Sequence, residues 1–267
     1  MQQYTIFDSH AHIYPQKIAV KAATSVGNFY STGMAGDGTI ETLLAFGKEA
    51  GISKYVVHSV ATSAHQVSSI NRFIVDSCKA HPEFIGFMTL HQDMTEQEIA
   101  DEVDVCIKNG IRGVKLHPDF QKFAINSPEG QKMYNVVGER LPILFHTGDK
   151  RYNFSSPYFL AEMAKKYPKM RFIGAHFGGY SCWEQVADAY KGCDNVWYDT
   201  SSTTGFFGDK VFLAGLIHTL GVEKFFFGCD YPMWKADEEI ERFLNIPLTE
   251  KEREAIFSGN LKEFLNI

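Results

Sequence analysis

Eight short apolar segments recur along the 267-residue chain, and this regular series restricts the folds available to it. Apart from the first interval, they end about 30 residues apart, a spacing that leaves room for one helix between strands. Several are almost continuously apolar, as strands covered on both faces of a parallel sheet are. The predicted strands are Tyr4–His12, Lys54–Ser59, Phe84–His91, Gly113–His117, Pro142–His146, Met170–His176, Val196–Thr200 and Phe225–Asp230.

Segments with helical periodicity lie between these strands. Thr95–Glu98 and Thr249–Glu252 each fit the capping box, in which a Thr and a Glu satisfy the free N–H groups at a helix start. The predicted helices are Thr39–Ala50, Gln66–Ala80, Thr95–Asn109, Glu129–Glu139, Pro157–Lys166, Tyr180–Lys191 and Phe207–Leu220, with one or two more after Lys235.

Eight alternating strands and helices predict an α/β fold, a single (β/α)8 TIM barrel over residues 1–267. The length agrees, since such barrels need about 250 residues. An open α/β sheet is the competing fold, but the chain has no glycine-rich nucleotide-binding motif. The long first interval, residues 13–38, is rich in glycine and is predicted to be a long loop or partial lid after the first strand.

Net charge limits the expected binding partners, and cysteine content indicates the expected location. Lys and Arg number 26 against 32 Asp and Glu, a net charge of −6, so neither nucleic acid nor an anionic membrane is expected as a partner. No apolar stretch is long enough to span a membrane, and the N-terminus does not read as a secretory signal. Five widely spaced cysteines without a C-x-x-C motif predict a reducing, cytoplasmic location. Whether the chain forms a homo-oligomer is left open.

The positions of the histidines point to chemistry. Six of the ten stand at the carboxyl end of a predicted strand, where barrel active sites are built, and Asp230 ends the eighth strand. Imidazole and carboxylate are the ligands that zinc prefers. The predicted metal ligands are therefore His10, His12, His146, His176 and Asp230. A buried histidine in a core is the alternative for any one of them, but that reading would have to hold independently for all five.

Several motifs in chain order resemble one family. They are Phe7-Asp8-Ser9-His10-Ala11-His12, Gly113-Val114-Lys115-Leu116-His117-Pro118, Leu144-Phe145-His146-Thr147-Gly148, Ala175-His176-Phe177-Gly178-Gly179, Phe227-Gly228-Cys229-Asp230-Tyr231-Pro232 and Ser258-Gly259-Asn260-Leu261. The chain is similar to the amidohydrolase superfamily, in the branch called amidohydrolase family 2. The resemblance implies that His10, His12, His146 and Asp230 bind metal, and that His176 binds a second metal or acts on the substrate.

The two-metal members of that superfamily carry a bridging carboxylate on the fourth strand, often a carboxylated Lys or a Glu. This chain has Lys115 and then His117 there. Carboxylation of Lys115 is left open, but Lys115 is expected to be a plain amine, so one divalent ion, Zn²⁺ by preference, is expected, with a second ion left open. Lys115 and His117 are predicted on the substrate side of the site. Arg151 and Tyr152, in the loop after the fifth strand, are also predicted to contact substrate, the guanidinium binding a carboxylate.

The leading hypothesis is a metal-dependent hydrolase that cleaves a small amide, ester or lactone with a metal-activated water. Asp230 would carry the proton, and His176 would assist catalysis. The alternative, implied by the same resemblance, is non-oxidative decarboxylation of an aromatic or muconate-type acid. A nuclease is disfavoured by the net charge, and a barrel that keeps its metal only for structure is the non-enzymatic possibility.

Overall fold

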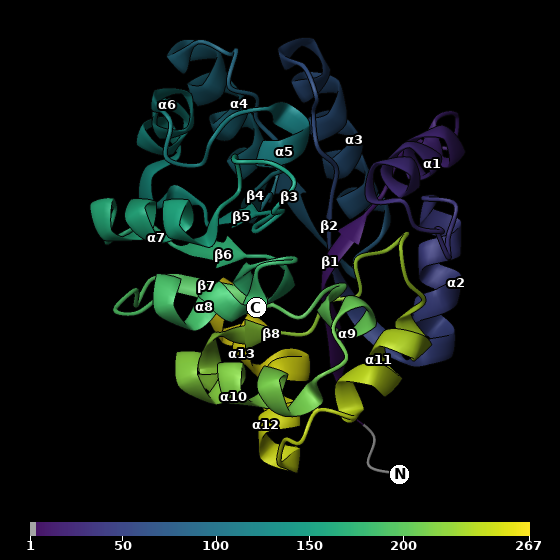
Figure 1. Ribbon diagram of the computed structural model, residues 1–267. Helices are drawn as coiled ribbons and strands as arrows, with labels where there is room; N and C mark the ends of the chain where they lie inside the picture. The colour runs from purple at the N-terminus through teal and green to yellow at the C-terminus, as the bar shows by residue number, and fades with distance from the viewer. Residues whose placement is uncertain (1–3) are drawn as a thin grey trace. The chain divides into compact units, whose positions relative to one another are not determined.

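The computed structural model describes residues 4–267, and its strands follow one another in a single eight-stranded sheet in chain order, β1 to β8 (Figure 1). This is the strand order of a (β/α)8 barrel, so the predicted fold is confirmed. The strands are β1 Ile6–His12, β2 Ile52–His58, β3 Phe84–Met88, β4 Gly113–Leu116, β5 Ile143–Phe145, β6 Phe172–Gly174, β7 Val196–Asp199 and β8 Phe225–Phe226.

All seven helices predicted between the strands are present, with ends that shift by a few residues. The α-helices are α1 Ala19–Tyr30, α2 Ile40–Ala50, α3 Val67–Ala80, α4 Glu96–Lys108, α5 Pro118–Gln121, α6 Pro128–Val137, α7 Pro157–Lys166, α8 Trp183–Ala189, α9 Thr203–Phe206, α10 Lys210–Leu220, α11 Ala236–Leu244, α12 Glu250–Glu254 and α13 Asn260–Leu265. Single turns are η1 Ala64–Gln66, η2 Gly138–Arg140, η3 His176–Gly178, η4 Val222–Lys224 and the π-helical turn η5 Ala255–Gly259.

The prediction of a loop over residues 13–38 needs correction. Helix α1 occupies Ala19–Tyr30, the middle of that segment, and ends at Ser31 in a left-handed conformation. The glycines that suggested a loop lie mostly after the helix, while Gly27 is buried inside it. The function of this segment as a lid stays a prediction.

The described chain consists of two compact units, residues 4–57 with 199–267 and residues 58–198. The prediction that residues 1–267 form one domain stays a prediction. In the second unit, β3 to β7 form a continuous parallel ladder, seen in Figure 1 for β4, β5 and β6. Lys115 of β4 pairs with Leu144 of β5, and both are almost fully buried.

In the first unit, the chain after β8 continues alongside β1. Ser9 N–H donates to Phe227 O, Asp230 N–H to His10 O and His12 N–H to Tyr231 O, each at 2.8 Å. The buried carboxylate of Asp8 joins the same two segments, because its Oδ1 accepts from the N–H groups of His10 and Cys229 at 3.0 and 2.9 Å. These bonds place residue 230 beside residues 10 and 12.

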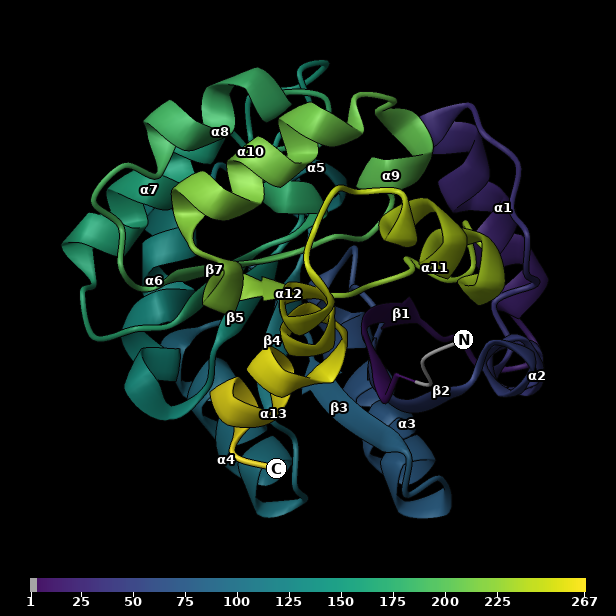
Figure 2. The same cartoon turned by 90° about the horizontal axis from the view of Figure 1, so that it is seen from below.

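The C-terminal helices close the core of this unit. Turn η5 packs against β1 and β8, and α11 packs against α2, with α12 and α13 in yellow in Figure 2. Asn260, from the Gly-Asn motif, donates from Nδ2 to Val222 O and Phe225 O at 2.8 Å each. The motif therefore satisfies one carbonyl in η4 and one at the start of β8. Within residues 4–267, no helix is long and apolar enough to cross a lipid bilayer.

Both predicted capping boxes are confirmed. Thr95 accepts from Glu98 N–H while Glu98 accepts from Thr95 N–H, and Thr249 and Glu252 repeat the arrangement. Each box satisfies donors that the first helical turn cannot pair internally.

We predict that Thr95→Ala lowers the free energy of unfolding by about 1 kcal/mol, because the cap acceptor of α4 is lost. Urea denaturation followed by circular dichroism measures the change. Thr219→Ala is the matched control, since that hydroxyl donates to Gly215 O within an exposed helical face and caps nothing. Equal losses in the two variants would contradict the role of the cap.

Candidate metal centre

Three predicted ligands from the first unit present donor atoms to one another. The Nε2 atoms of His10 and His12 lie 3.3 Å apart, and Asp230 Oδ1 lies 3.5 Å from the first and 3.6 Å from the second. Both histidines come from β1, where they point to the same face because strand side chains alternate. Asp230 has a left-handed backbone, φ +65°, a strained conformation for a residue with a Cβ.

This triangle fits a divalent metal. Ligand atoms at about 2.1 Å from a tetrahedral zinc ion lie about 3.4 Å from one another, close to the three distances observed. Two imidazoles and one carboxylate also form a donor set that borderline divalent ions accept. His10, His12 and Asp230 are thus suited in chemistry and spacing to hold one cation.

Sequence reasoning missed a carboxylate in this unit. Asp199, the last residue of β7, lies with Oδ2 2.8 Å from His10 Nδ1, and both side chains are fully buried. Asp199 ends a strand, and a carboxylate at a strand end is the signal that identified Asp230, but Asp199 was not among the predicted ligands. Its hydrogen bond joins positions 189 apart in the chain, so no local pattern could reveal it.

The second unit gathers its own histidines after β4, β5 and β6. His146 Nδ1 lies 3.0 Å from His176 Nε2. The ring of His117 stacks between Phe120 and His146, with centroid distances of 3.7 and 4.1 Å. His176 has φ +60°, an unfavourable conformation for a residue with a Cβ. Three predicted site residues of this unit therefore lie together.

Asp119 joins this histidine group and was also missed. Its Oδ2 lies 3.7 Å from His146 Nε2 and accepts from Ser155 at 2.6 Å, and its buried Oδ1 has no hydrogen-bond partner. Burial raises the pKa of Asp119 from 3.8 to about 7, although the Ser155 hydrogen bond lowers it. Asp119, His146 and Asp149 also lie close enough to count as a possible metal-binding group.

The predicted substrate-contacting residues occupy different environments. Arg151 forms a bidentate ion pair with Asp149, from Nε to Oδ1 at 3.0 Å and from Nη2 to Oδ2 at 2.6 Å, while 42% of its side chain stays exposed. Tyr152 packs beside the guanidinium and is exposed. Lys115 is fully buried within β4, one residue before that strand ends. The contact of these residues with substrate stays a prediction. That His146 and His176 bind the same metal as His10, His12 and Asp230 also stays a prediction.

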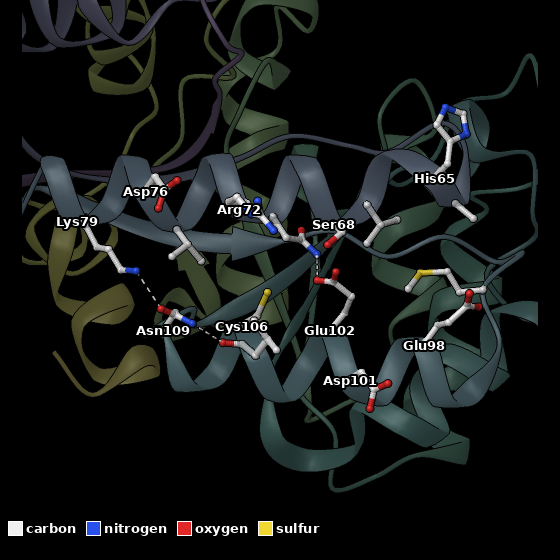
Figure 3. A pocket seen from close by; sticks show the side chains of 16 residues that line it. His65, Ser68, Arg72, Asp76, Lys79, Glu98, Asp101, Glu102, Cys106 and Asn109 are labelled. Carbon is white, nitrogen blue, oxygen red and sulfur yellow. Dashed lines mark hydrogen bonds between the residues drawn. The ribbon is translucent and has the colours of Figure 1, made fainter.

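A groove of about 870 Å³ lies elsewhere in the second unit, between α3 and α4 (Figure 3). Its labelled side chains come from these helices and their neighbouring turns, and Asn71 and Lys79 bridge it by hydrogen bonds to Glu102 and Asn109. None of its lining residues stands at the carboxyl end of a strand. Barrel chemistry occurs at those ends, so this groove is not the candidate site.

The model of the amidohydrolase family, in its family 2 form, matches residues 7–267. The chain belongs to the amidohydrolase family. The predicted family is thereby confirmed, and membership together with the His and Asp groups supports a divalent metal in this amidohydrolase. No curated protein matches the chain.

Solved structures agree in fold with this amidohydrolase. An uncharacterised TIM-barrel protein from Bordetella bronchiseptica is 17% identical, with a TM-score of 0.80 and coverage of 98% of each chain. 5-Carboxyvanillate decarboxylase from Sphingomonas paucimobilis is 13% identical, with a TM-score of 0.75 over 99% of this chain and 100% of its own. A dihydroxybenzoic acid decarboxylase from Polaromonas sp., crystallised with manganese and 2-nitroresorcinol, is 14% identical, with a TM-score of 0.75 over 99% and 97%.

We predict that Asp119 makes the stability of the metal-free protein depend on pH. Between pH 3.8 and about 7 the folded carboxyl holds a proton that the unfolded chain releases. The contribution of Asp119 to the free energy of unfolding is therefore complete below pH 3.8 and is lost as the pH rises through 7. From pH 5 to pH 8, the unfolding free energy of the native protein should fall by roughly 2 kcal/mol relative to Asp119→Asn.

Urea titrations in EDTA at the two pH values measure this difference. Asp101→Asn, at an exposed position of α4, is the control and should follow the native protein at both. The prediction would be contradicted if the unfolding free energies of Asp119→Asn and of the native protein differed by the same amount at both pH values. The carboxyl would then titrate equally in the folded and unfolded states.

Proposed function

We propose that this amidohydrolase is a divalent-metal-dependent decarboxylase of a small aromatic carboxylic acid. The observation that carries the metal part is the triangle of His10 Nε2, His12 Nε2 and Asp230 Oδ1, 3.3 to 3.6 Å apart. The choice of reaction draws on the relatives that are decarboxylases of hydroxylated benzoic acids. This reading replaces hydrolysis, the leading hypothesis from the sequence, as the function best supported.

Two features of the chain favour one metal and a carboxylate substrate. β4 contains no Asp or Glu, and Lys115 as an unmodified amine would not bridge two ions. Arg151 offers a half-exposed guanidinium whose orientation is fixed by Asp149, and guanidinium is the side chain suited to bidentate carboxylate recognition. The relative solved with manganese makes Mn²⁺ as good a candidate as Zn²⁺.

His10, His12 and Asp230 would hold the cation, with His146 and His176 as further predicted ligands or neighbours. A bound divalent cation supplies Lewis acidity, which stabilises negative charge on substrate oxygen atoms. In the reaction the bond from the ring carbon to the carboxylate breaks, carbon dioxide leaves, and the electron pair stays on the ring carbon. That carbon then takes one proton, so the enzyme must provide an acid.

We propose Asp230 as that acid, assisted by His176. Ser202 Oγ lies 2.5 Å from Asp230 Oδ2, which orients the carboxyl group while Oδ1 faces His10 and His12. A positioned carboxyl or imidazole group contributes about 10²–10⁴ in rate to such a transfer. Arg151 would orient the substrate before the bond breaks.

We predict that the protein loaded with Mn²⁺ or Zn²⁺ releases carbon dioxide from a hydroxybenzoate acid. The panel contains the two acids 2,6-dihydroxybenzoate and 5-carboxyvanillate. It also contains amides, esters and lactones that carry an aromatic ring of the same size as these acids. Labelled carbon dioxide and the arene product are measured together by mass spectrometry. Hydrolysis of an amide, ester or lactone without carbon dioxide release would overturn the proposal and restore the hydrolase reading.

We predict that Asp230→Asn reduces kcat at least 100-fold, because the amide cannot supply the proton. Circular dichroism should show the native fold, since the two side chains have nearly the same size. Asp237→Asn, on the exposed first turn of α11, is the matched control and should retain native turnover. Near-native kcat in Asp230→Asn would remove Asp230 from the role of acid.

A further inference from the structure

The short segment that follows β7 contacts two of the donors in the triangle. Asp199 Oδ2 lies 2.8 Å from His10 Nδ1, and Ser202 Oγ donates to Asp230 Oδ2 at 2.5 Å. Asp199, His10 and Ser202 are each 1% exposed or less, so water competes weakly for these bonds. One segment thus holds side chains from both β1 and the turn after β8.

The bond to Asp199 decides which nitrogen of His10 can bind a metal. A carboxylate accepts only, so His10 must donate from Nδ1, and the neutral ring then carries its lone pair on Nε2. Nε2 is the atom that faces His12 and Asp230. A carboxylate on the far side of a ligating imidazole also increases its basicity as a donor.

Asp199 is itself held in place. Its Oδ1 accepts from the backbone N–H of Ser201 at 3.1 Å and from the hydroxyl of the same residue. The carboxylate therefore has bonds to both oxygens, and its orientation does not depend on His10 alone.

Ser202 acts on Asp230 in a similar manner. Its hydroxyl donates to Asp230 Oδ2 and accepts from Trp234 Nε1 at 3.0 Å, which fixes the direction of the O–H bond. Arg242 lies over the Trp234 ring, 4.6 Å from its centre, and so helps to hold the indole. Ser202 adopts φ +57°, a conformation that a serine tolerates poorly without compensating contacts.

We propose that Asp199 and Ser202 are positioning residues that determine the metal affinity of the His10, His12 and Asp230 triangle. Asp199 sets the tautomer and orientation of His10, and Ser202 sets the orientation of Asp230. This inference rests on the metal of the proposed function, but it concerns affinity for the ion alone and not the reaction.

The test measures binding of Zn²⁺ and of Mn²⁺ to the metal-free protein, without substrate, by competition with a chromophoric chelator. Asp199→Asn keeps the size of the side chain and should weaken binding 10- to 100-fold. Ser202→Gly removes the hydroxyl and also suits the positive φ, so it should weaken binding while the unfolding midpoint of the metal-free protein is retained.

Asp76→Asn on the exposed face of α3 and Ser31→Gly, another serine with positive φ, are the matched controls and should bind as the native protein does. Native-like affinity in both Asp199→Asn and Ser202→Gly would overturn this inference and leave the metal of the proposed function intact. A native protein that binds neither ion would instead overturn the proposed metal, and this inference with it. If Asp199→Asn does not fold, the result for Ser202→Gly decides.

Discussion

Backbone hydrogen bonds between β1 and the segment 227–231 are the interaction on which the candidate centre depends. Three of them, each 2.8 Å long, join Ser9 to Phe227, His10 to Asp230 and His12 to Tyr231. Strand neighbours are separated by a fixed distance, so this pairing determines how far the Asp230 carboxylate lies from the two imidazoles. Without it, residues 220 positions apart would have no reason to present their donors to one point.

In both units, buried carboxylates accept hydrogen bonds or form ion pairs. The carboxylates of Asp8 and Asp199 accept backbone N–H groups, and Asp149 pairs with Arg151. Asp8 and Asp119 are satisfied only in part, because Asp8 Oδ2 and Asp119 Oδ1 are buried without a hydrogen-bond partner. Buried titratable groups are concentrated at functional sites. Removal from water destabilises the fold, but it also shifts the pKa of the buried group and so changes how it binds protons and metals.

Left-handed backbone occurs at three residues of these clusters. His176, Ser202 and Asp230 have φ near +60°, although only glycine adopts that region without cost. Each stands in the segment that follows a strand, His176 after β6, Ser202 after β7 and Asp230 after β8. Ser202 donates to Asp230 and accepts from Trp234 Nε1, and these two hydrogen bonds offset part of the strain at Ser202 and Asp230.

The sequence was sufficient for the barrel and the family. Apolar runs repeated at the helix-plus-strand interval predict the eight strands, and polar residues at their ends predict His10, His12 and Asp230. Local patterns failed where the deciding factor was not local. Helix α1 was read as a loop because glycines surround and enter it, and Asp119 was overlooked because Pro118 and α5 follow β4 without a periodic signal.

The chain by itself therefore determined which residue types stand at strand ends, because side-chain alternation and hydrophobic period are properties of neighbouring residues. Only the tertiary structure decided which nitrogen of His10 faces its fellow donors, which carboxylate selects it, and which hydroxyl holds Asp230. These choices depend on distances between segments far apart in sequence, and such distances exist only once the strands have paired.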